Sequence, residues 1–334
     1  MGTYIAAFGL SLSAALIATP LVRRIAIRLG VHDMPTDRKV HSDPVPYLGG
    51  LAIVIAFSLT VLAGAFVMGI QGSYLKIAAI IGGGLLLSGV GLWDDLRVVP
   101  GWIKVPVELG LGVVLFAAGV RAELFGILAL DLILTVAWVI GITNALNYMD
   151  NMDGLSSGVA AIASVYFAAL ASFSGQFLVA SLAAALAGCA IGFLWYNRPP
   201  ARIFMGDTGS LFLGFLLAAL GLELSFDNIA RVTFFVPIAI MAVPIVDALM
   251  VSVSRVRRGL SPIHPGRDHT SHRLVRLGVP STAAVALIYA TAAATGWIGV
   301  VIAFAEPTTA YMLMGWLILI GGFLGALLLR VDVS

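Results

Sequence analysis

The sequence predicts an all-α polytopic membrane protein, and two observations carry that prediction. Of the 334 residues, 60% are hydrophobic and only 11% are charged, and the mean hydropathy is +1.04. Soluble domains have about 25% charged residues, so this chain lacks the charge for an ordinary aqueous surface. The apolar residues also come in runs of about 20, which is the length that crosses a bilayer as a helix. A cytosolic enzyme, a nucleic-acid-binding protein and a disulfide-stabilised secreted domain are therefore excluded.

Eleven apolar segments are long enough to be membrane helices, and we expect them to form one integral membrane domain over residues 1–334. They do not alternate between apolar and polar residues, as the strands of a membrane barrel would. The predicted helices are 3–22, 48–70, 74–93, 103–120, 127–146, 155–173, 176–196, 209–224, 232–254, 281–304 and 309–329.

The basic residues predict how the chain is oriented. Sixteen of the 19 Lys and Arg residues fall on one side, in the segments 23–47, 94–104, 144–155, 197–208, 255–280 and the carboxyl tail. Because basic loops remain in the cytoplasm, we expect these segments and the carboxyl terminus to be cytoplasmic and the amino terminus to lie outside. The first apolar run precedes its basic residues, which predicts a membrane helix and not a cleavable signal peptide.

The first acidic motif is the pair Asp94-Asp95, at the cytoplasmic end of the third predicted helix. Two adjacent carboxylates repel each other unless a cation neutralises them or one holds a proton. The pair therefore suits Mg²⁺ binding or proton acceptance. Simple solvation at a helix end is the alternative.

The second acidic motif consists of Asn147, Asp150 and Asp153, spaced three residues apart after an apolar helix. On a helix this spacing places the three side chains on one slowly drifting face. The segment 144–155 has no Lys or Arg to pair with the acids. Unpaired carboxylates at a membrane boundary favour a functional role over a structural one.

The third motif runs from Asn197 through Phe204, Gly206 and Asp207 to Ser210, at the start of the eighth predicted helix. Asp207 could supply one ligand to a hard metal ion, and the free N–H groups of a helix start favour an anion. A capped helix with turn glycines is the alternative, but capping explains only the hydroxyl groups.

Basic side chains that suit phosphate oxygens gather in two cytoplasmic loops. They are Arg38, Lys39 and His41 in the first loop, and Arg267, His269, His272 and Arg273 in the second. The first loop could equally be a positive-inside anchor. In the second, zinc is an alternative, but no cysteine is near and the H-E-x-x-H spacing is missing.

Acids that suit a divalent cation and bases that suit phosphates, together at a membrane surface, predict phosphoryl transfer between a lipid-borne and a soluble substrate. Two rival functions remain, an aspartate-rich membrane prenyltransferase and a secondary transporter of anionic sugars or nucleotides. The first leaves the basic loops unexplained, and the second would place its polar groups near the bilayer midplane. Glu108 and Asp247 lie inside apolar runs, where function and a hydrogen bond between helices are equally good explanations.

Five segments together resemble the polyprenyl-phosphate N-acetylhexosamine-1-phosphate transferases. They are DRKVHSDPVPYLGG, GLWDDL, NALNYMDNMDGLSSG, FLWYNRPPARIFMGDTGSLFLG and SPIHPGRDHTSHRLVRLG, and they follow the order of that family over residues 37–278. The pattern is more similar to the N-acetylglucosamine branch than to the muramoyl-pentapeptide branch. It departs from the family at Ser271, where a histidine is common, and this leaves the identity of the sugar open.

The resemblance implies a Mg²⁺-dependent enzyme, with Mn²⁺ as the alternative metal. It would move an N-acetylhexosamine 1-phosphate, with GlcNAc-1-phosphate favoured, from a UDP-sugar to undecaprenyl or another polyprenyl phosphate, releasing UMP. That reaction begins the synthesis of a cell-envelope polysaccharide such as lipopolysaccharide or teichoic acid. The expected partners are the two substrates and membrane lipid, without nucleic acid, in a bacterial cytoplasmic membrane. The resemblance is also compatible with a homodimer.

The resemblance further assigns roles to residues. It implies that Asp207 is the principal metal ligand, with Asp94 and Asp150 in the same metal set, and that one of Asp94 and Asp95 deprotonates or positions the lipid phosphate. The expected catalytic residues are Asp94, Asp95, Asp207, His269 and His272. The expected substrate-binding residues are Arg38, Lys39, His41, Asn147, Asp150, Asp153, Asn197, Phe204, Gly206, Ser210, Arg267 and Arg273. Direct transfer and a two-step route through an aspartyl-phosphate both stay open.

Overall fold

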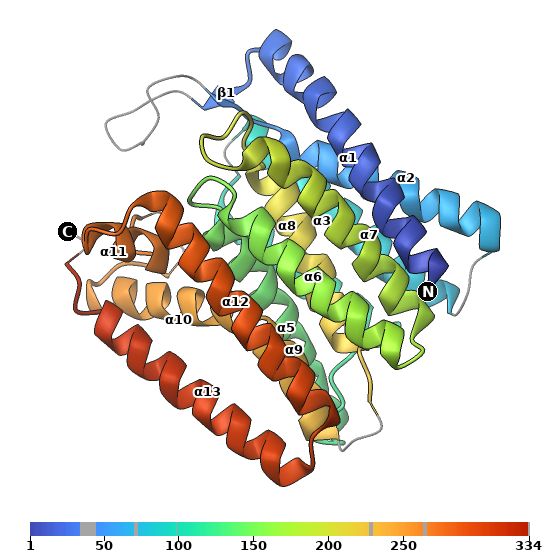
Figure 1. Ribbon diagram of the computed structural model, residues 1–334, viewed down its shortest axis with the longest axis vertical. Helices are drawn as coiled ribbons and strands as arrows, with labels where there is room; N and C mark the ends of the chain where they lie inside the picture. Colours follow the sequence, from blue (N-terminus) through green and yellow to red (C-terminus); the bar gives the residue numbers. More distant parts are fainter. Residues whose placement is uncertain (34–44, 70–72, 98, 227–229, 263–265, 333–334) are drawn as a thin grey trace.

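Helices make up most of the part of the chain that the computed structural model describes, which is residues 1–33, 45–69, 73–97, 99–226, 230–262 and 266–332 (Figure 1). The helices are α1 (Gly2–Leu29), α2 (Gly49–Met68), α3 (Tyr74–Leu96), α4 (Gly101–Ala117), α5 (Leu128–Met149), α6 (Leu155–Phe173), α7 (Phe177–Asn197), α8 (Gly206–Glu223), α9 (Ala230–Ile240), α10 (Ala242–Arg257), α11 (Thr270–Arg276), α12 (Ser281–Phe304) and α13 (Pro307–Leu328). Two short strands, β1 (His32–Asp33) and β2 (Val45–Pro46), pair antiparallel, with His32 opposite Pro46.

Each of the eleven predicted segments corresponds to a helix or to a bent pair of helices. Within the described residues, nine helices are long and apolar enough to cross a membrane, and the bent pair α9–α10 would make a tenth. Helix α4 has 17 residues and is shorter than these spans. The structure therefore supports an all-α multi-pass membrane protein, while the count of eleven spans stays a prediction.

The predicted helix over 232–254 is in fact two helices, α9 and α10, bent by 76°. Pro244 lies in the first turn of α10 and has no N–H to donate to the carbonyl of Ile240, so the hydrogen-bond ladder is interrupted at the bend. Pro237 lies inside α9, one turn earlier. Helix α11, in the loop between α10 and α12, is a further element that the apolar pattern did not predict, because it is short and polar.

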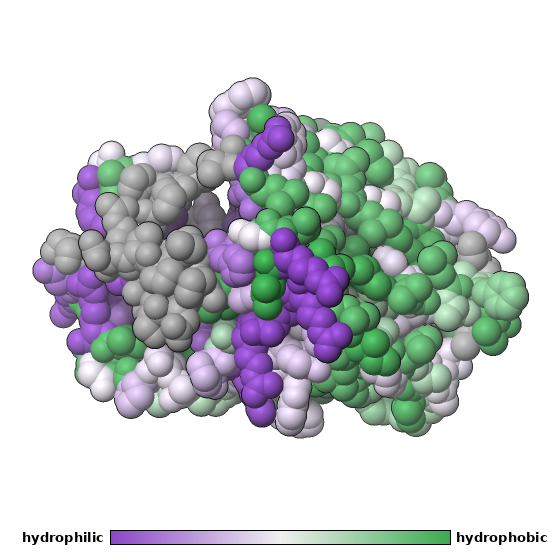
Figure 2. Space-filling model, turned by 90° about the horizontal axis from the view of Figure 1, so that it is seen from above, coloured by the Kyte–Doolittle hydropathy of each residue, from purple (hydrophilic) through white to green (hydrophobic). Residues whose placement is uncertain are grey.

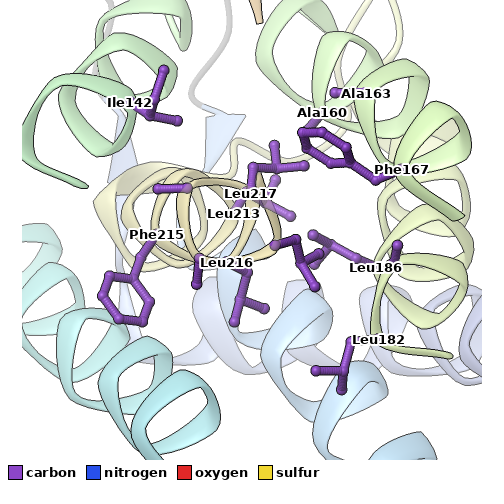
Figure 3. Packing of buried hydrophobic residues seen from close by; sticks show 14 of the residues in the cluster. Ile142, Ala160, Ala163, Phe167, Leu182, Leu186, Leu213, Phe215, Leu216 and Leu217 are labelled. Carbon is purple, nitrogen blue, oxygen red and sulfur yellow. The ribbon is translucent and has the colours of Figure 1, made fainter. Parts of the chain in front are cut away.

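Helix α8 lies at the centre of the bundle. Of an 18-residue window in α8, 89% is buried, against 11% in α13 at the edge. The sequence of α8 is apolar on every side, which is the pattern of a helix surrounded by protein. Figure 3 shows Leu213 and Leu217 on one side of this helix and Phe215 on another, and all three side chains are buried. The start of α8 is thus held in a fixed place by the surrounding helices.

Helix α2 begins in direct contact with the start of α8. The backbone N–H of Gly49 donates to the carbonyl of Phe204, and that of Gly50 donates to Met205, both over 2.8 Å. A Cβ atom on Gly50 would lie 2.2 Å from the nitrogen of Gly209, so only glycine allows this approach. The contact fixes the polar segment that leads into α8.

The polar loops that the sequence assigned to one side do meet at one end of the bundle. Contacts described below join the last turns of α3, α5 and α7 to the first turns of α4, α6 and α8. Figure 2, a view from above Figure 1, shows hydrophilic residues on the left and in the centre and hydrophobic residues on the right. At the other end of α3 and α8, Lys76 pairs with Glu223 over 2.7 Å.

Candidate active site

Asp95 binds the amino-terminal end of α8. Its Oδ1 accepts from the N–H of Asp207 over 2.8 Å, and its Oδ2 accepts from the N–H of Thr208 over 3.0 Å and from the Thr208 hydroxyl over 2.5 Å. The first N–H groups of a helix have no partner within the helix, so the carboxylate satisfies two of them. Gly206 has a φ of 71°, and a Cβ there would lie 2.5 Å from Asp95 Oδ2. The glycine and the acid together set the position of Asp207.

A cluster of two acids and one base lies beside this helix start. The ammonium of Lys104, on α4, is 2.7 Å from Asp94 Oδ2 and 2.5 Å from Asp207 Oδ2. Asn147, on α5, donates to Asp207 Oδ1 over 2.8 Å and to Ser210 Oγ over 2.9 Å. We call Asp94, Lys104, Asn147 and Asp207 the cation cluster. Its members come from α3, α4, α5 and α8, so four helices must pack correctly to form it.

The cation cluster has the chemistry of a site for a hard divalent cation. Asp94 and Asp207 each place one carboxylate oxygen on the same ammonium nitrogen, so two oxygens already converge on one cation. Magnesium is commonly held by one or two carboxylates together with water and substrate phosphates. In the described ranges, no three His, Cys, Asp or Glu side chains are placed to share a metal ion. Asp94 and Asp207 meet at one ammonium nitrogen, and the place of Asp150 in the predicted metal set stays a prediction.

Asp150 follows the last residue of α5, and its side chain accepts a hydrogen bond from the N–H of Gly206. Burial raises the pKa of its carboxyl to about 8, and the nearby carboxylates of Asp207 and Asp95 add to the shift. The carboxyl of Asp150 therefore keeps its proton to a higher pH than an exposed aspartate does.

Asp153 and Asn197 shape the loops around the cluster through backbone contacts. Asp153 Oδ2 accepts from the N–H of Ala201 over 2.9 Å. The Asn197 side chain accepts from the N–H of Gly154 over 3.1 Å and donates to the carbonyl of Ile203 over 3.0 Å. Asn197 is buried, and these contacts with the protein backbone fix the geometry of the two loops. Substrate binding by these two residues stays a prediction.

Phe204 and the loop before α8 lie against the segment between β2 and α2. The Phe204 N–H donates to the carbonyl of Pro46 over 2.9 Å, and its ring meets Tyr47 edge to face at 5.8 Å between centroids. Three of the predicted substrate-binding residues, Arg38, Lys39 and His41, belong to the connection between β1 and β2 and lie outside the described residues.

The predicted His/Arg loop is held by the intramembrane acid Asp247 on α10. Asp247 Oδ2 is 2.9 Å from His269 Nδ1, and Asp247 Oδ1 accepts from the N–H of Thr270 over 2.7 Å. His269 is thus fixed just before the first turn of α11. Asp268 beside it pairs with Arg255 over 3.0 Å and with Arg258 over 2.7 Å. Although burial opposes ionisation, hydrogen bonds from Arg255 hold the pKa of Asp268 below its usual range.

Arg273 is buried and bound to protein on every side that the structure describes. It is 1% exposed, and it donates to the carbonyls of Leu328 and Val331 and to the hydroxyl of Ser254 over 2.8–2.9 Å. These contacts hold α11 against α10 and the end of α13, which gives Arg273 a structural role. The predicted contact with substrate stays a prediction. Arg267, in contrast, is exposed.

The unusual Ser271 joins the His/Arg loop to the loop after α5. Its hydroxyl donates to Asn151 Oδ1 over 2.6 Å, and Asn151 donates in turn to the carbonyl of Tyr148. The hydroxyl at this position therefore bridges the two loops that carry His272 and Asp150. We take this bridge as the structural consequence of having serine here and not histidine.

His272 should make the protein sensitive to acid. Burial, followed by the charges of His269 and Arg267, lowers its pKa to about 4. Above pH 6.5 the imidazole is neutral in both the folded and the unfolded chain. As the pH falls toward 4 the unfolded chain takes up a proton that the folded one refuses, so about 1–3 kcal/mol of stability is lost. We expect His272→Gln to reduce the fall in melting temperature between pH 7 and pH 4.

The measurement is thermal unfolding of both proteins in one bilayer preparation. Between pH 7 and pH 8 the difference between the two melting temperatures should stay constant, which serves as the internal control. An equal fall below pH 6.5 in both proteins would contradict the burial of a neutral His272.

Lys104 is the site residue that sequence reasoning missed. It was counted only as one base in the connection between the third and fourth predicted helices. The available signal was the acid pair itself, because two adjacent carboxylates near a lipid surface require a positive partner and Lys104 begins the next helix. Its contact with Asp207, 103 residues away, is not visible in any local pattern.

The fold and the cation cluster define a multi-pass membrane protein whose polar site lies at one end of a helix bundle. The comparisons make this specific. Residues 77–225 match the model of the family Glycosyl transferase family 4. The chain is 35% identical to a probable undecaprenyl-phosphate N-acetylglucosaminyl 1-phosphate transferase of Bacillus subtilis, an alignment that covers 85% of this chain and 81% of the relative.

Two further relatives carry names of the same kind. The chain is 34% identical to a decaprenyl-phosphate N-acetylglucosaminephosphotransferase of Mycolicibacterium smegmatis, over 90% of this chain and 81% of the relative. It is 27% identical to the undecaprenyl-phosphate alpha-N-acetylglucosaminyl 1-phosphate transferase of Escherichia coli K12, over 83% of this chain and 78% of the relative. The chain belongs to glycosyl transferase family 4, which confirms the resemblance drawn from its motifs.

Proposed function

We propose that this protein transfers N-acetylglucosamine 1-phosphate from UDP-N-acetylglucosamine to undecaprenyl or another polyprenyl phosphate, releasing UMP. The relatives are named for this sugar phosphate and for undecaprenyl or decaprenyl phosphate as its acceptor. The observation that carries the proposal is the cation cluster, in which Asp94 and Asp207 converge on one cation at the end of the bundle. The lipid product would begin the synthesis of a cell-envelope polysaccharide.

In the proposed reaction, an oxygen of the lipid phosphate attacks the sugar-bearing phosphorus of the UDP-sugar. The new bond joins the two phosphates of the lipid product, and the bond to the phosphate of UMP breaks. Asp94 or Asp95 would accept a proton from the lipid phosphate. Asp95 binds the start of α8 through both oxygens, and Asp94 binds Lys104 and the N–H of Val99. A route through an aspartyl-phosphate stays the alternative.

Mg²⁺ fits this site because its donors are hard carboxylate oxygens. Asp207 and Asp94 would hold it, and Asn147 and Ser210 would keep Asp207 in place. When bound, the ion would neutralise charge on the diphosphate of the nucleotide sugar. The chain's own residues would position the two substrates and accept the proton of the lipid phosphate.

We also propose that the site-bearing end faces the cytoplasm of a bacterial cell, with the amino terminus outside and eleven spans. The excess of basic residues on that side supports this orientation. The eleven spans would be the nine long apolar helices, the shorter helix α4, and the bent pair α9–α10 counted as one span. UDP-sugars are soluble, so a site at this end could receive them from the cytoplasm.

The test uses purified protein in bilayers with Mg²⁺, undecaprenyl phosphate and a panel of UDP-sugars. We expect UMP release with UDP-N-acetylglucosamine, and we expect it to require the lipid phosphate. If no UDP-sugar gives UMP, the proposal is wrong. Uptake of labelled UDP-sugar into sealed vesicles without UMP would favour the transporter, and release of pyrophosphate from a polyprenyl diphosphate would favour the prenyltransferase.

A further inference from the structure

The ammonium of Lys104 lies where a divalent cation would have to bind. It contacts the same oxygens of Asp94 and Asp207 that the proposed function assigns to the metal. Two positive charges cannot share these oxygens at such distances, since like charges in a partly buried site repel strongly. Metal binding therefore requires Lys104 to leave Asp207, and a lysine that leaves needs another carboxylate close by.

Glu108 has the properties of that second acceptor. It lies four residues after Lys104 on α4, so the two side chains share one face of the helix. Its side chain is 0% exposed, and its Oε2 accepts from Asn144 Nδ2 over 2.5 Å. Its Oε1 is buried and has no hydrogen-bond partner among the described residues. A buried acceptor left without a partner is costly, so this atom calls for an explanation.

Asn144 holds Glu108 in this arrangement. The same amide nitrogen also donates to the carbonyl of Ile140 over 2.9 Å, which fixes the Asn144 side chain on α5. One oxygen of Glu108 is thereby occupied and the other is left open. The other acids of the site have partners of their own: Asp95 binds the start of α8, Asp150 binds the N–H of Gly206, and Asp153 binds the N–H of Ala201.

We infer that Glu108 is the alternate partner of Lys104, so that Lys104 moves between the Asp94–Asp207 pair and Glu108 as the divalent cation binds and leaves. This inference rests on the proposed function, which supplies the cation. The lysine stem has four rotatable carbons, and its ammonium can rotate to a new acceptor within one helical turn. Glu108 is thus a positioning residue that acts through Lys104, and Asn144 orients it.

The test is Mn²⁺ binding to the purified full-length protein in bilayer discs, without either substrate, measured by the electron paramagnetic resonance of free Mn²⁺. We expect Glu108→Gln to weaken binding about tenfold, because Lys104 then stays on Asp207. Lys104→Met should tighten binding, because the competing charge is gone. In the Lys104→Met background, Glu108→Gln should change binding by less than about twofold, since Glu108 acts only through the lysine.

Glu223→Gln is the matched control, because Glu223 also pairs with a lysine but at the far end of α8. It should leave Mn²⁺ binding unchanged. Glu108→Asp keeps the charge, and it should bind Mn²⁺ within about twofold of the wild type.

Several results would overturn the inference. One is unchanged Mn²⁺ binding in Glu108→Gln, and another is equal weakening with and without Lys104, which would mean that Glu108 attracts the cation directly. If the wild type binds Mn²⁺ and releases UMP, and Glu108→Gln binds Mn²⁺ equally well, only the role of Glu108 is overturned. A wild-type protein that binds no Mn²⁺ overturns both this inference and the metal in the proposed function.

Discussion

Asp207→Asn should lower UMP release about a thousandfold while the protein still folds. The asparagine keeps the size of the side chain, and its oxygen can still accept from Asn147, so the start of α8 should stay in place. It removes the negative charge that meets Lys104 and that the proposed reaction needs for a cation. The measurement is the rate of UMP release at saturating substrates, together with the melting temperature of both proteins in the same bilayers.

Glu223→Gln is a suitable control for this variant, because it removes an acid from the opposite end of the same helix. It should keep the wild-type rate. An Asp207→Asn protein that retains more than about a tenth of the wild-type rate would be incompatible with Asp207 at the centre of catalysis, because such losses in other enzymes reach a hundredfold or more.

Substitution of the adjacent acids Asp94 and Asp95 by asparagine should affect the stability of the protein to different extents. Asp95→Asn should destabilise the protein by about 1–3 kcal/mol, because an amide has one acceptor oxygen where the carboxylate uses two to bind the start of α8. Asp94→Asn should destabilise the protein less and remove most of the activity, because Asp94 binds Lys104 and the N–H of Val99 and not the start of α8.

The two variants are compared by thermal unfolding and by UMP release in one bilayer preparation. Asp95→Asn should also lose activity. Part of the activity should be recovered at low temperature, because the start of α8 is then folded. If Asp94→Asn melts well below the wild type while Asp95→Asn does not, the division of roles between the two acids is wrong.

Much of the fold could be predicted because membrane helices leave strong local signals. The length of each apolar run gave the helices, and the basic residues gave the set of loops that meet at one end. The break between Ile240 and Ala242 was missed because Pro244 was read as an ordinary residue of an apolar run. The apolar pattern does not predict α11, because its seven residues, five of them polar, are too few to show a helical period.

The site was predictable only as a list of residue types. The motifs indicated that Asp94, Asp95, Asn147 and Asp207 carry chemistry, but not which of them touch. Asp94 and Asp207 both pair with Lys104, which lies on another helix. The spacing of residues along the sequence does not predict contacts between different helices. The intramembrane acids show the same limit. Asp247 holds the backbone before α11, and Glu108 binds Asn144, which no local pattern indicates.

The most direct test of the account follows the sugar-bearing phosphate. Purified protein in undecaprenyl-phosphate bilayers receives UDP-N-acetylglucosamine labelled in its β-phosphate, and the lipid and aqueous phases are counted separately. Our account predicts that the label enters the lipid in equal amount to the UMP released, and that both are lost in Asp207→Asn. Label that stays in the aqueous phase while UMP is released would mean hydrolysis, and it would contradict transfer to the lipid.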